Sequence, residues 1–386
     1  MRRREFFLGA SLLALGNGVR ASGVARTKAA LIGHTGRGNY GHGLDAIFDA
    51  RPGIEVVAVA DPDGPGRAKA QARVRAPRAY ADYREMLEKE KPQLVSICPR
   101  VTGERHAMLA AALAVGAHVY CEKPFTRTLA EADDVLAAAA RAGRLIAVAH
   151  QGRVSPATLL LKRRLDEGLI GELVEIRVHG KQDRRAGGED MVVLGTHQFD
   201  IVRFLAGDPE WCSARILHRG REVTRADIRA ATEDVGPVLG DEIEASFAFP
   251  RGVNVHYTSR EKSAVVAGPW GLEVIGSKGR LRLLNDPHTL AFHLHEDALS
   301  PKGQTREWRP LTDATTNSPE GRDASIAMAN RRVVDDWLEA AAGGREPVCS
   351  GRAAMRSLEM IHAVFLAGLA RARVEFPLRN RAHPLG

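Results

Sequence analysis

Apolar runs and amphipathic stretches alternate along the first half of the chain. Helical periodicity predicts helices at 104–115 and 129–141, and a further helix that follows a glycine-rich turn and extends through Ala50. Five apolar runs predict buried β-strands, at residues 29–32, 54–60, 93–98, 117–121 and 145–149. Strands that alternate with helices build a parallel sheet. We therefore expect a Rossmann-type domain over residues 26–150.

The pattern changes after residue 150. A helix is predicted at 156–167 and a strand at 173–180, and two amphipathic helices at 322–342 and 351–371. Four later segments alternate apolar and polar residues, as antiparallel strands do: 241–249, 253–259, 271–275 and 280–284. We expect residues 151–386 to form an α/β domain with a largely antiparallel open sheet. Such a sheet can cover a substrate cleft and pair with a second subunit, which predicts a homo-oligomer.

The first 25 residues have the pattern of a targeting segment. The series Arg3-Arg4-Glu5-Phe6-Phe7-Leu8 resembles a twin-arginine export signal, and Gly23-Val24-Ala25 offers a cleavage site before Arg26. The apolar stretch at 9–19 is shorter than the roughly 20 residues that a membrane-spanning helix needs. We expect a periplasmic or otherwise exported protein with no stable membrane insertion after processing. An uncleaved basic leader or anchor is the alternative.

Composition narrows the class of protein. The 386 residues are 44% hydrophobic and 26% charged, which excludes a disordered or fibrous chain. The net charge of +8 is spread over both halves, so nucleic acid is not an expected partner. The cysteines, none of them in a CxxC pair, predict neither a zinc ribbon nor a disulfide framework: Cys98, Cys121, Cys212 and Cys349.

Glycines follow the first predicted strand directly. The turn fits GxGxxG literally at 36–41, but the register 33–38 lies immediately after the strand and is preferred, although Thr35 replaces its middle glycine. Because glycine has no Cβ, a pyrophosphate can approach the backbone closely. The residues expected to contact a dinucleotide here are Gly33, Thr35, Gly36, Arg37 and Gly38.

Asp61 ends the second predicted strand, 28 residues after Gly33. A carboxylate at this place can accept both ribose hydroxyls and repels a 2′-phosphate, which favours NAD. Arg67 leaves NADP open as an alternative. Asp61 could also cap the helix that begins near Gly64, and this role does not exclude the first.

A lysine stands where a predicted parallel strand ends. Glu122-Lys123-Pro124 follows the strand at 117–121, and open parallel sheets bind their ligands at such carboxyl ends. Lys123 is therefore a catalytic candidate. We expect Cys98, Pro99, Glu122 and Lys123 to lie beside the cofactor.

Seven features resemble those of the Gfo/Idh/MocA (glucose-fructose oxidoreductase and inositol dehydrogenase) family. They are the glycine turn, Asp61, the segment 83–87, Pro99, the segment 116–119, Glu122-Lys123-Pro124 and Gly195-Thr196-His197-Gln198-Phe199-Asp200. The resemblance implies a nucleotide-binding domain followed by an α/β domain whose open sheet faces the active site. It also implies that Lys123 and His197 flank the nicotinamide and the substrate carbon.

The chain departs from this family at two places. Many of its dehydrogenases carry an aspartate four residues before the histidine, and here that position is Val193, which leaves the proton relay incomplete. Glu189 and Asp190 are nearby candidates to replace it. The segment from Pro99 to His106 is longer than the family's usual loop, which leaves the role of His106 open.

A polar stretch at 181–190 leads into the helix that carries His197. It is either a solvated loop or part of a site for a hydroxyl-rich ligand, which needs convergent donors and acceptors. The expected substrate-binding residues are Arg153, Lys181, Asp183, Arg184, Glu189, Asp190 and His197. No metal is expected, although His288, His293 and His295 lie in one stretch, because no HExxH or clustered Cys/His signature is present.

These features favour an NAD-dependent oxidoreductase that acts on a secondary alcohol of a sugar, cyclitol or related polyol. Lys123 would polarise the hydroxyl or take its proton, and His197 would bind the same oxygen or relay the proton. Two alternatives recycle the nicotinamide: a glycoside hydrolase with transient oxidation, and a two-sugar oxidoreductase. A third, encouraged by Val193, is a non-catalytic binder of sugar or nucleotide.

Overall fold

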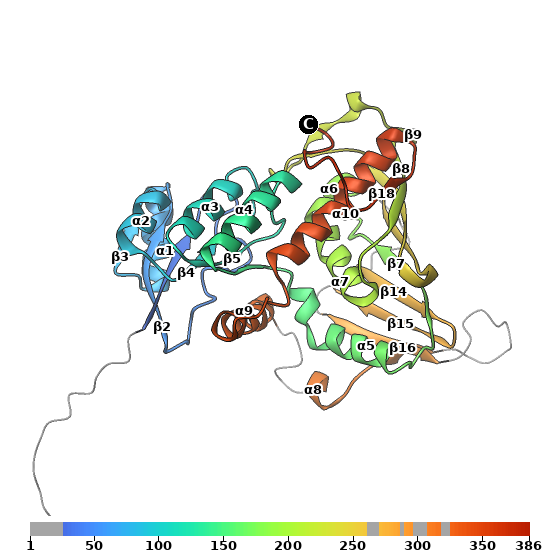
Figure 1. Cartoon of the computed structure of the whole chain (residues 1–386), viewed down its shortest axis with the longest axis horizontal. Coiled ribbons are helices and arrows are strands. Elements are labelled where there is room, and N and C mark those ends of the chain that lie inside the picture. The colour runs from blue at the N-terminus through green and yellow to red at the C-terminus, as the bar shows by residue number, and fades with distance from the viewer. Residues whose placement is uncertain (1–25, 261–269, 286–288, 296–306, 318–324) are drawn as a thin grey trace, which may run out of the picture.

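A computed structural model describes residues 26–260, 270–285, 289–295, 307–317 and 325–386 (Figure 1). Its first sheet has six parallel strands in the order β3-β2-β1-β4-β5-β6, the Rossmann order of a doubly wound sheet. The strands are β1 (Thr27–Ile32), β2 (Ile54–Ala60), β3 (Arg78–Tyr80), β4 (Leu94–Ile97), β5 (His118–Cys121) and β6 (Ile146–Val148). The sequence prediction of a parallel Rossmann sheet is confirmed.

Residues 26–150 form four α-helices. They are α1 (Gly64–Val74), α2 (Tyr83–Glu90), α3 (Arg105–Ala114) and α4 (Leu129–Ala142). Asp63, and not Asp61, caps α1 by accepting the N–H of Gly66. Thr128 and Glu131 form a capping box at the start of α4, and Gly143 ends it in the left-handed conformation.

The prediction of a helix after the glycine turn is wrong. Residues 35–50 run through consecutive turns, although Leu44, Ile47 and Phe48 still pack into the core. The physical reason is the backbone: four glycines of this segment have positive φ, as do Asn39 and Ala50, and left-handed residues interrupt a right-handed helix.

Among the described residues, the second sheet has ten strands. Its path runs β17-β16-β15-β14-β7-β13-β12-β8-β18, and β9 also pairs with β8. Of these described pairs, only β13–β7 is parallel. The bounds are β7 (Leu173–His179), β8 (Trp211–His218), β9 (Arg221–Glu222), β12 (Glu242–Ala248), β13 (Asn254–Arg260), β14 (Gly271–Gly276), β15 (Gly279–Leu284), β16 (Leu290–His295), β17 (Arg309–Pro310) and β18 (Val374–Glu375). The expected antiparallel character is confirmed, whereas β8 was missed by sequence reasoning. A separate ribbon pairs β10 (Arg229–Ala230) with β11 (Pro237–Val238).

Helices cover one face of this sheet (Figure 1). They are α5 (Pro156–Asp166), the short α6 (Gly188–Asp190), α7 (Thr196–Ala206) and α10 (Gly351–Ala370), with α8 (Ala314–Asn317) beyond α5. A π-helical turn, η2 (Met191–Gly195), joins α6 to α7, and three 3-10 turns complete the second half: η1 (Gln151–Val154), η3 (Arg225–Asp227) and η4 (Pro250–Gly252). Side chains on β12 and β13 alternate between buried and exposed, so the other face is open.

One C-terminal helix returns to the first domain. The helix α9 (Ile326–Gly343) lies beside the Rossmann sheet in Figure 1 and begins at Ile326, four residues later than predicted. Val333, Val334 and Trp337 join a core cluster with Leu31 and Tyr120. The chain therefore crosses between the two domains more than once.

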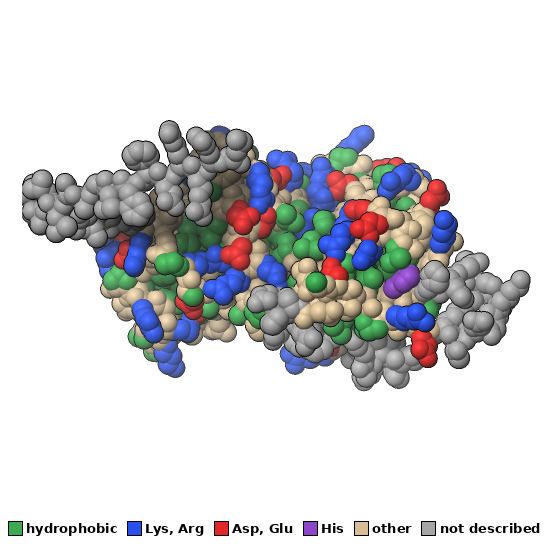
Figure 2. Space-filling view, turned by 90° about the horizontal axis from the view of Figure 1, so that it is seen from below, with side chains coloured by type: hydrophobic (Ala, Val, Ile, Leu, Met, Phe, Trp, Pro, Cys, Tyr) green, Lys and Arg blue, Asp and Glu red, His purple; other side chains and the backbone are tan. Residues whose placement is uncertain are grey.

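Among the described residues, only α10 is long and apolar enough to cross a membrane. Of its most apolar window, 72% is buried inside the protein, as expected of a core helix. On the face in Figure 2, basic and acidic side chains are interspersed over both domains and form no single basic stripe.

Candidate active site between the two domains

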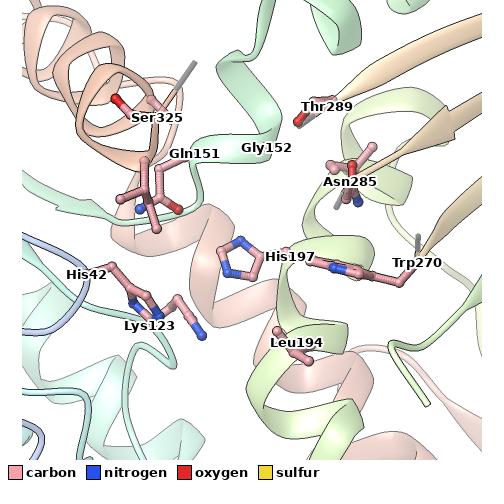
Figure 3. Close-up of a pocket in the computed structure, with 13 residues that line it drawn as sticks. His42, Lys123, Gln151, Gly152, Leu194, His197, Trp270, Asn285, Thr289 and Ser325 are labelled. Atoms are coloured by element: carbon pink, nitrogen blue, oxygen red, sulfur yellow. The ribbon is translucent and has the colours of Figure 1, made fainter. Parts of the chain in front are cut away.

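A cavity of about 220 Å³ lies where the two domains meet. Figure 3 shows His42, Lys123 and His197 in a row across it, with Trp270 beyond His197. Asn285 and Thr289, at strand ends of the second sheet, form one side of the cavity, and Gln151 and Ser325 form another. The row brings together the two residues that the sequence singled out for catalysis, Lys123 and His197.

Lys123 follows β5 and is only 5% exposed. Its Nζ donates to the main-chain carbonyl oxygen of Val193, 2.9 Å away in the π-helical turn, a kind of irregularity that recurs at functional sites. Burial lowers the pKa of the amine, and the nearby Glu122 carboxylate opposes that shift only in part. The amine is thus held in place and shifted toward its neutral form.

A buried arginine fixes the loop that carries Lys123. The Arg105 guanidinium donates to the carbonyl oxygens of Glu122, Pro99 and Pro124. These bonds tie the end of β4 to the end of β5. The sequence left the role of the neighbouring His106 open. Its Nε2 lies 2.7 Å from Asp134 Oδ2, with which it pairs on the surface.

Glu122 organises the same loop from the other side. Its Oε1 accepts the N–H of His42 at 2.7 Å and lies 2.6 Å from His42 Nδ1, and its Oε2 accepts the N–H of Lys123. Burial opposes the charge on Glu122, but the His42 contacts and the Lys123 charge hold the pKa of its carboxyl below the usual value. Glu122 therefore keeps a negative charge next to the lysine.

His197 lies in the first turn of α7 and lines the cavity. The next residue, Gln198, anchors the helix to the sheet by donating to the carbonyl oxygens of His179 and Gly271. Burial, and then the charge of Lys123, lower the pKa of His197 well below its ordinary value. The ring is neutral at physiological pH, so it can donate or accept one hydrogen bond at a substrate oxygen.

His150 packs edge-on against His197, with ring centroids 5.3 Å apart. Its Nε2 shares a hydrogen bond of 3.0 Å with Thr196 Oγ1. Burial lowers the pKa of His150 to about 4, so this ring is neutral as well. It fixes the start of α7 and carries no charge toward the cavity.

Three residues expected at the substrate have protein partners instead. Arg153 forms a two-pronged ion pair with Asp200, with both N–O distances 2.7 Å. Glu189 accepts from Thr232 and from Arg229, and Asp190 accepts from Ser259 Oγ at 2.6 Å. Burial raises the pKa of Asp190.

The other polar residues of that stretch lie around the same loop. Asp183 pairs with Arg185, Lys181 is half-buried, and Arg184 is exposed. Apart from His197, none of the expected substrate residues lines the 220 Å³ cavity. The stretch at 181–190 therefore supports the helix that carries His197, and neither Glu189 nor Asp190 takes the place of the missing aspartate.

A second cavity, of about 270 Å³, lies at the ends of β1 and β2. Ile32, Ala60 and Met108 give it apolar walls, and Asp61 stands at its edge. The Asp61 carboxylate accepts from Thr35 Oγ1 at 2.7 Å and Tyr40 Oη at 2.9 Å, two donors with which ribose hydroxyls would compete. Charged side chains, among them Asp82, Arg84 and Glu104, line the rest of the cavity. Its place at the strand ends, with a carboxylate at the edge, fits the adenosine half of NAD.

Glycines from both registers of the turn are needed. A Cβ at Gly38 would lie 2.5 Å from the Arg100 nitrogen, and one at Gly41 would lie 2.4 Å from the Cys98 carbonyl oxygen. Gly36 has φ of 84° and open space around it, as a phosphate cradle requires. The chain at Gly33 is covered by the Tyr40 ring.

The remaining expected cofactor residues surround this turn. Arg37 pairs with Glu104 at 2.8 Å and with Asp234 of the second domain at 3.0 Å. The Cys98 side chain is buried, and burial raises the pKa of its thiol. Arg67 donates to the carbonyl oxygen of Asp61. The four cysteines are free and buried.

Sequence reasoning missed several cavity residues, for which no motif exists: His42, Gln151, Trp270, Asn285, Thr289 and Ser325. Asn330 on α9 holds two of them, by donating to the His42 carbonyl oxygen and accepting from Gln151 Nε2. Within the described ranges, no three His, Cys, Asp or Glu side chains could hold a metal ion. His293 lies in β16, and His288 is outside those ranges.

Comparison with known proteins adds independent evidence. A family model described as an oxidoreductase family with an NAD-binding Rossmann fold matches residues 27–150, and its C-terminal α/β domain matches 162–376. D-apiose dehydrogenase of Paraburkholderia graminis is 31% identical over 363 residues, which cover 91% of this chain and 90% of that protein. Inositol 2-dehydrogenase of Gluconacetobacter diazotrophicus is 26% identical over 67% of this chain and 78% of that protein.

Solved structures show the same fold. A levoglucosan dehydrogenase in complex with NADH and L-sorbose superposes with a TM-score of 0.74 at 19% identity, and covers 92% of this chain and all of that one. An NAD binding oxidoreductase from Klebsiella pneumoniae gives a TM-score of 0.74 at 22% identity, over 91% of this chain and 99% of that one.

Proposed function

Because this chain belongs to the Gfo/Idh/MocA family of NAD-dependent oxidoreductases, we propose that it oxidises a secondary alcohol of a neutral monosaccharide, anhydrosugar or cyclitol. The observation that carries this function is the buried Lys123 amine, aimed into a cavity that it shares with His197. Relatives named D-apiose dehydrogenase and inositol 2-dehydrogenase support this class of substrate.

The residues present divide the chemistry between them. NAD, when bound, accepts the hydride from the carbinol carbon. Lys123, whose lowered pKa favours the neutral amine, takes the hydroxyl proton, and His197 hydrogen-bonds the same oxygen. In the reverse direction the lysine ammonium returns the proton to the alkoxide.

A carboxylate at position 193 could accept the proton from Lys123. Because this position is Val193, the proton leaves the lysine by another route. The partner of Nζ is a main-chain carbonyl, which accepts a hydrogen bond but does not take up a proton. Glu122 accepts the backbone N–H of Lys123, whereas Nζ donates to Val193. The lowered pKa of His197 makes its ring a poor proton acceptor, so the proton passes from Lys123 to water.

A substrate panel tests this function. Purified protein is mixed with NAD and, in turn, neutral pentoses, hexoses, anhydrosugars, inositols and p-nitrophenyl glycosides. NADH formation and release of p-nitrophenol are followed by absorbance. Sustained formation of NADH with one of these compounds is the expected result. Cleavage of a glycoside without net NADH would move the function to a hydrolase with recycled cofactor, and ligand binding without either reaction would indicate a binder.

Export is proposed as the route to the site of action. Support comes from the twin-arginine pattern at Arg3-Arg4-Glu5-Phe6-Phe7-Leu8, because that route carries folded proteins and so allows NAD to be loaded beforehand. Cell fractionation of wild type and an Arg3→Lys, Arg4→Lys double variant tests it: only wild type should reach the periplasm. Mass spectrometry of nucleotide released from the denatured protein then shows whether NAD travels with it.

Homo-oligomer formation is proposed to use the open face of the large sheet. Every second side chain of β12 and β13 points to that face and is half-buried or exposed. No helix among the described residues covers it. Light scattering of the purified protein gives the subunit count, and a monomer would overturn this proposal.

A further inference from the structure

Asn285 lines the cavity and carries a buried side-chain amide whose hydrogen bonds are not made. Within the described part of the chain, neither Oδ1 nor Nδ2 of its amide has a hydrogen-bond partner, although both atoms are shielded from solvent. The residue lines the cavity that holds Lys123 and His197 (Figure 3). Buried polar groups in folded proteins are nearly always hydrogen-bonded, so two unpaired atoms on one side chain need an explanation.

The backbone makes this position rigid. Asn285 follows β15 and Trp270 precedes β14, and these strands pair with Gly271 opposite Leu284. The N–H of Asn285 donates to the carbonyl oxygen of Trp270 at 2.8 Å. The two residues therefore stand side by side, just beyond the same end of a strand pair.

Trp270 continues the row of catalytic side chains. Its ring lies 6.1 Å from that of His197, at 56°. A flat apolar ring at this distance offers a surface for the C–H face of a cyclic polyol, whose hydroxyls then point sideways. Asn285 is the backbone neighbour of Trp270 and lines the same cavity.

The chemistry of an amide selects the group that it would bind. Oδ1 only accepts and Nδ2 only donates, and the two atoms lie side by side. Two neighbouring hydroxyls match this pair, because one donates to Oδ1 while the other accepts from Nδ2. A carboxylate or phosphate would satisfy Nδ2 alone, and among the described residues lining the cavity the one ionisable Lys or Arg is Lys123.

We propose that Asn285 is a specificity-determining residue that binds a vicinal diol of a cyclic, uncharged substrate, with Trp270 against the ring's C–H face. This inference rests on the proposed function and adds which part of the substrate is recognised. A site built to bind hydroxyls rejects an analogue that lacks one, because the site's own polar atoms are then left unpaired.

The test compares wild type with Asn285→Leu, which has similar size and no polar atoms. The probes are the panel compound with the highest kcat/KM and its monodeoxy analogues. Wild type should lose about 100-fold or more in kcat/KM on one or two of the deoxy compounds. Asn285→Leu should lose about as much on the parent compound and discriminate less than about 5-fold between parent and deoxy forms.

Stability and binding provide a second readout. Because Leu removes two unsatisfied buried atoms, Tm of Asn285→Leu should equal or exceed that of wild type. The parent compound should raise Tm of wild type with NADH present and leave the Asn285→Leu Tm unchanged.

The outcomes separate the two proposals. No NADH from any panel compound overturns the proposed function. Turnover by wild type together with unchanged discrimination in Asn285→Leu overturns the role of Asn285, and so does an equal loss on parent and deoxy compounds, which would indicate a structural residue or one that binds only water.

Discussion

The amine of Lys123 donates to the main-chain carbonyl oxygen of Val193, 2.9 Å away. The Val193 side chain packs into the hydrophobic core and is 3% exposed. The lysine is thus positioned by the backbone of a π-helical turn and not by the side chain at this place.

Val193→Asp should therefore harm the protein without repairing a relay. The new carboxylate would lie among apolar side chains, which costs about 2–4 kcal/mol in the free energy of unfolding. Urea denaturation measures that loss, and kcat should not rise. A variant as stable as wild type with a higher kcat would show that the side chain can reach Lys123.

Lys123→Met should abolish turnover while NAD still binds. Loss of the proton acceptor should lower kcat by about 100-fold or more, and the dissociation constant for NAD should change less than about 3-fold, since the adenosine cavity is untouched. Lys89→Met, on the surface and paired with Glu85, is the matched control and should leave both quantities unchanged. Normal turnover by Lys123→Met would remove the lysine from the mechanism.

The pH dependence follows from the lowered pKa of Lys123. Oxidation needs the neutral amine, so kcat/KM for oxidation should rise with pH and level off above an inflection that lies below the ordinary lysine value of 10.5. Reduction needs the ammonium form and should fall over the same range. Glu122→Gln removes the charge that raises this pKa, so its inflection should move to lower pH. Profiles that are flat in both directions would contradict this assignment.

Acid should destabilise the junction between α10 and the C-terminal segment. Burial, and then the nearby His383, lower the pKa of His362 to about 3, and burial followed by Arg127 lowers that of His383 to about 4. Both values lie below the unfolded value near 6.5, so the stability is fully present above that pH and is lost as pH falls through about 4.

Urea denaturation between about pH 7 and about pH 4 measures this loss. His383→Gln should show a shallower decline in the free energy of unfolding, because one of the two groups no longer titrates. The rings are 4.9 Å apart, and His383 Nδ1 accepts the N–H of Leu385, a bond that protonation would break. An identical decline in both proteins would assign the acid sensitivity to other groups.

Much of the first domain was predictable because buried parallel strands appear as continuous apolar runs, as in β1, β2 and β4. The conformation of the segment after Gly33 was not predictable, since its amphipathic pattern favours a helix. Its glycines have positive φ, which interrupts a helix. Strand β8 was missed because its buried positions do not alternate regularly.

Some residues of the site could be predicted from the sequence, and others could not. Lys123 and His197 could be found because one marks a strand end and the other a motif. Arg153 could not be placed, because sequence shows a charge but not its partner, which is Asp200. Trp270 and Asn285 come together only through the register of two antiparallel strands, which no local pattern specifies.

The return of α9 to the Rossmann sheet means that the nucleotide-binding domain is discontinuous in sequence. Trp337 is fully buried and packs 6.1 Å from Tyr120, in a cluster that also includes Val333 and Leu31. A fragment ending at residue 150 would expose this apolar surface and aggregate. Any autonomous unit for calorimetry or NMR has to include residues 325–349, added as a second peptide or fused after a linker, so that the missing helix completes the fold by fragment complementation.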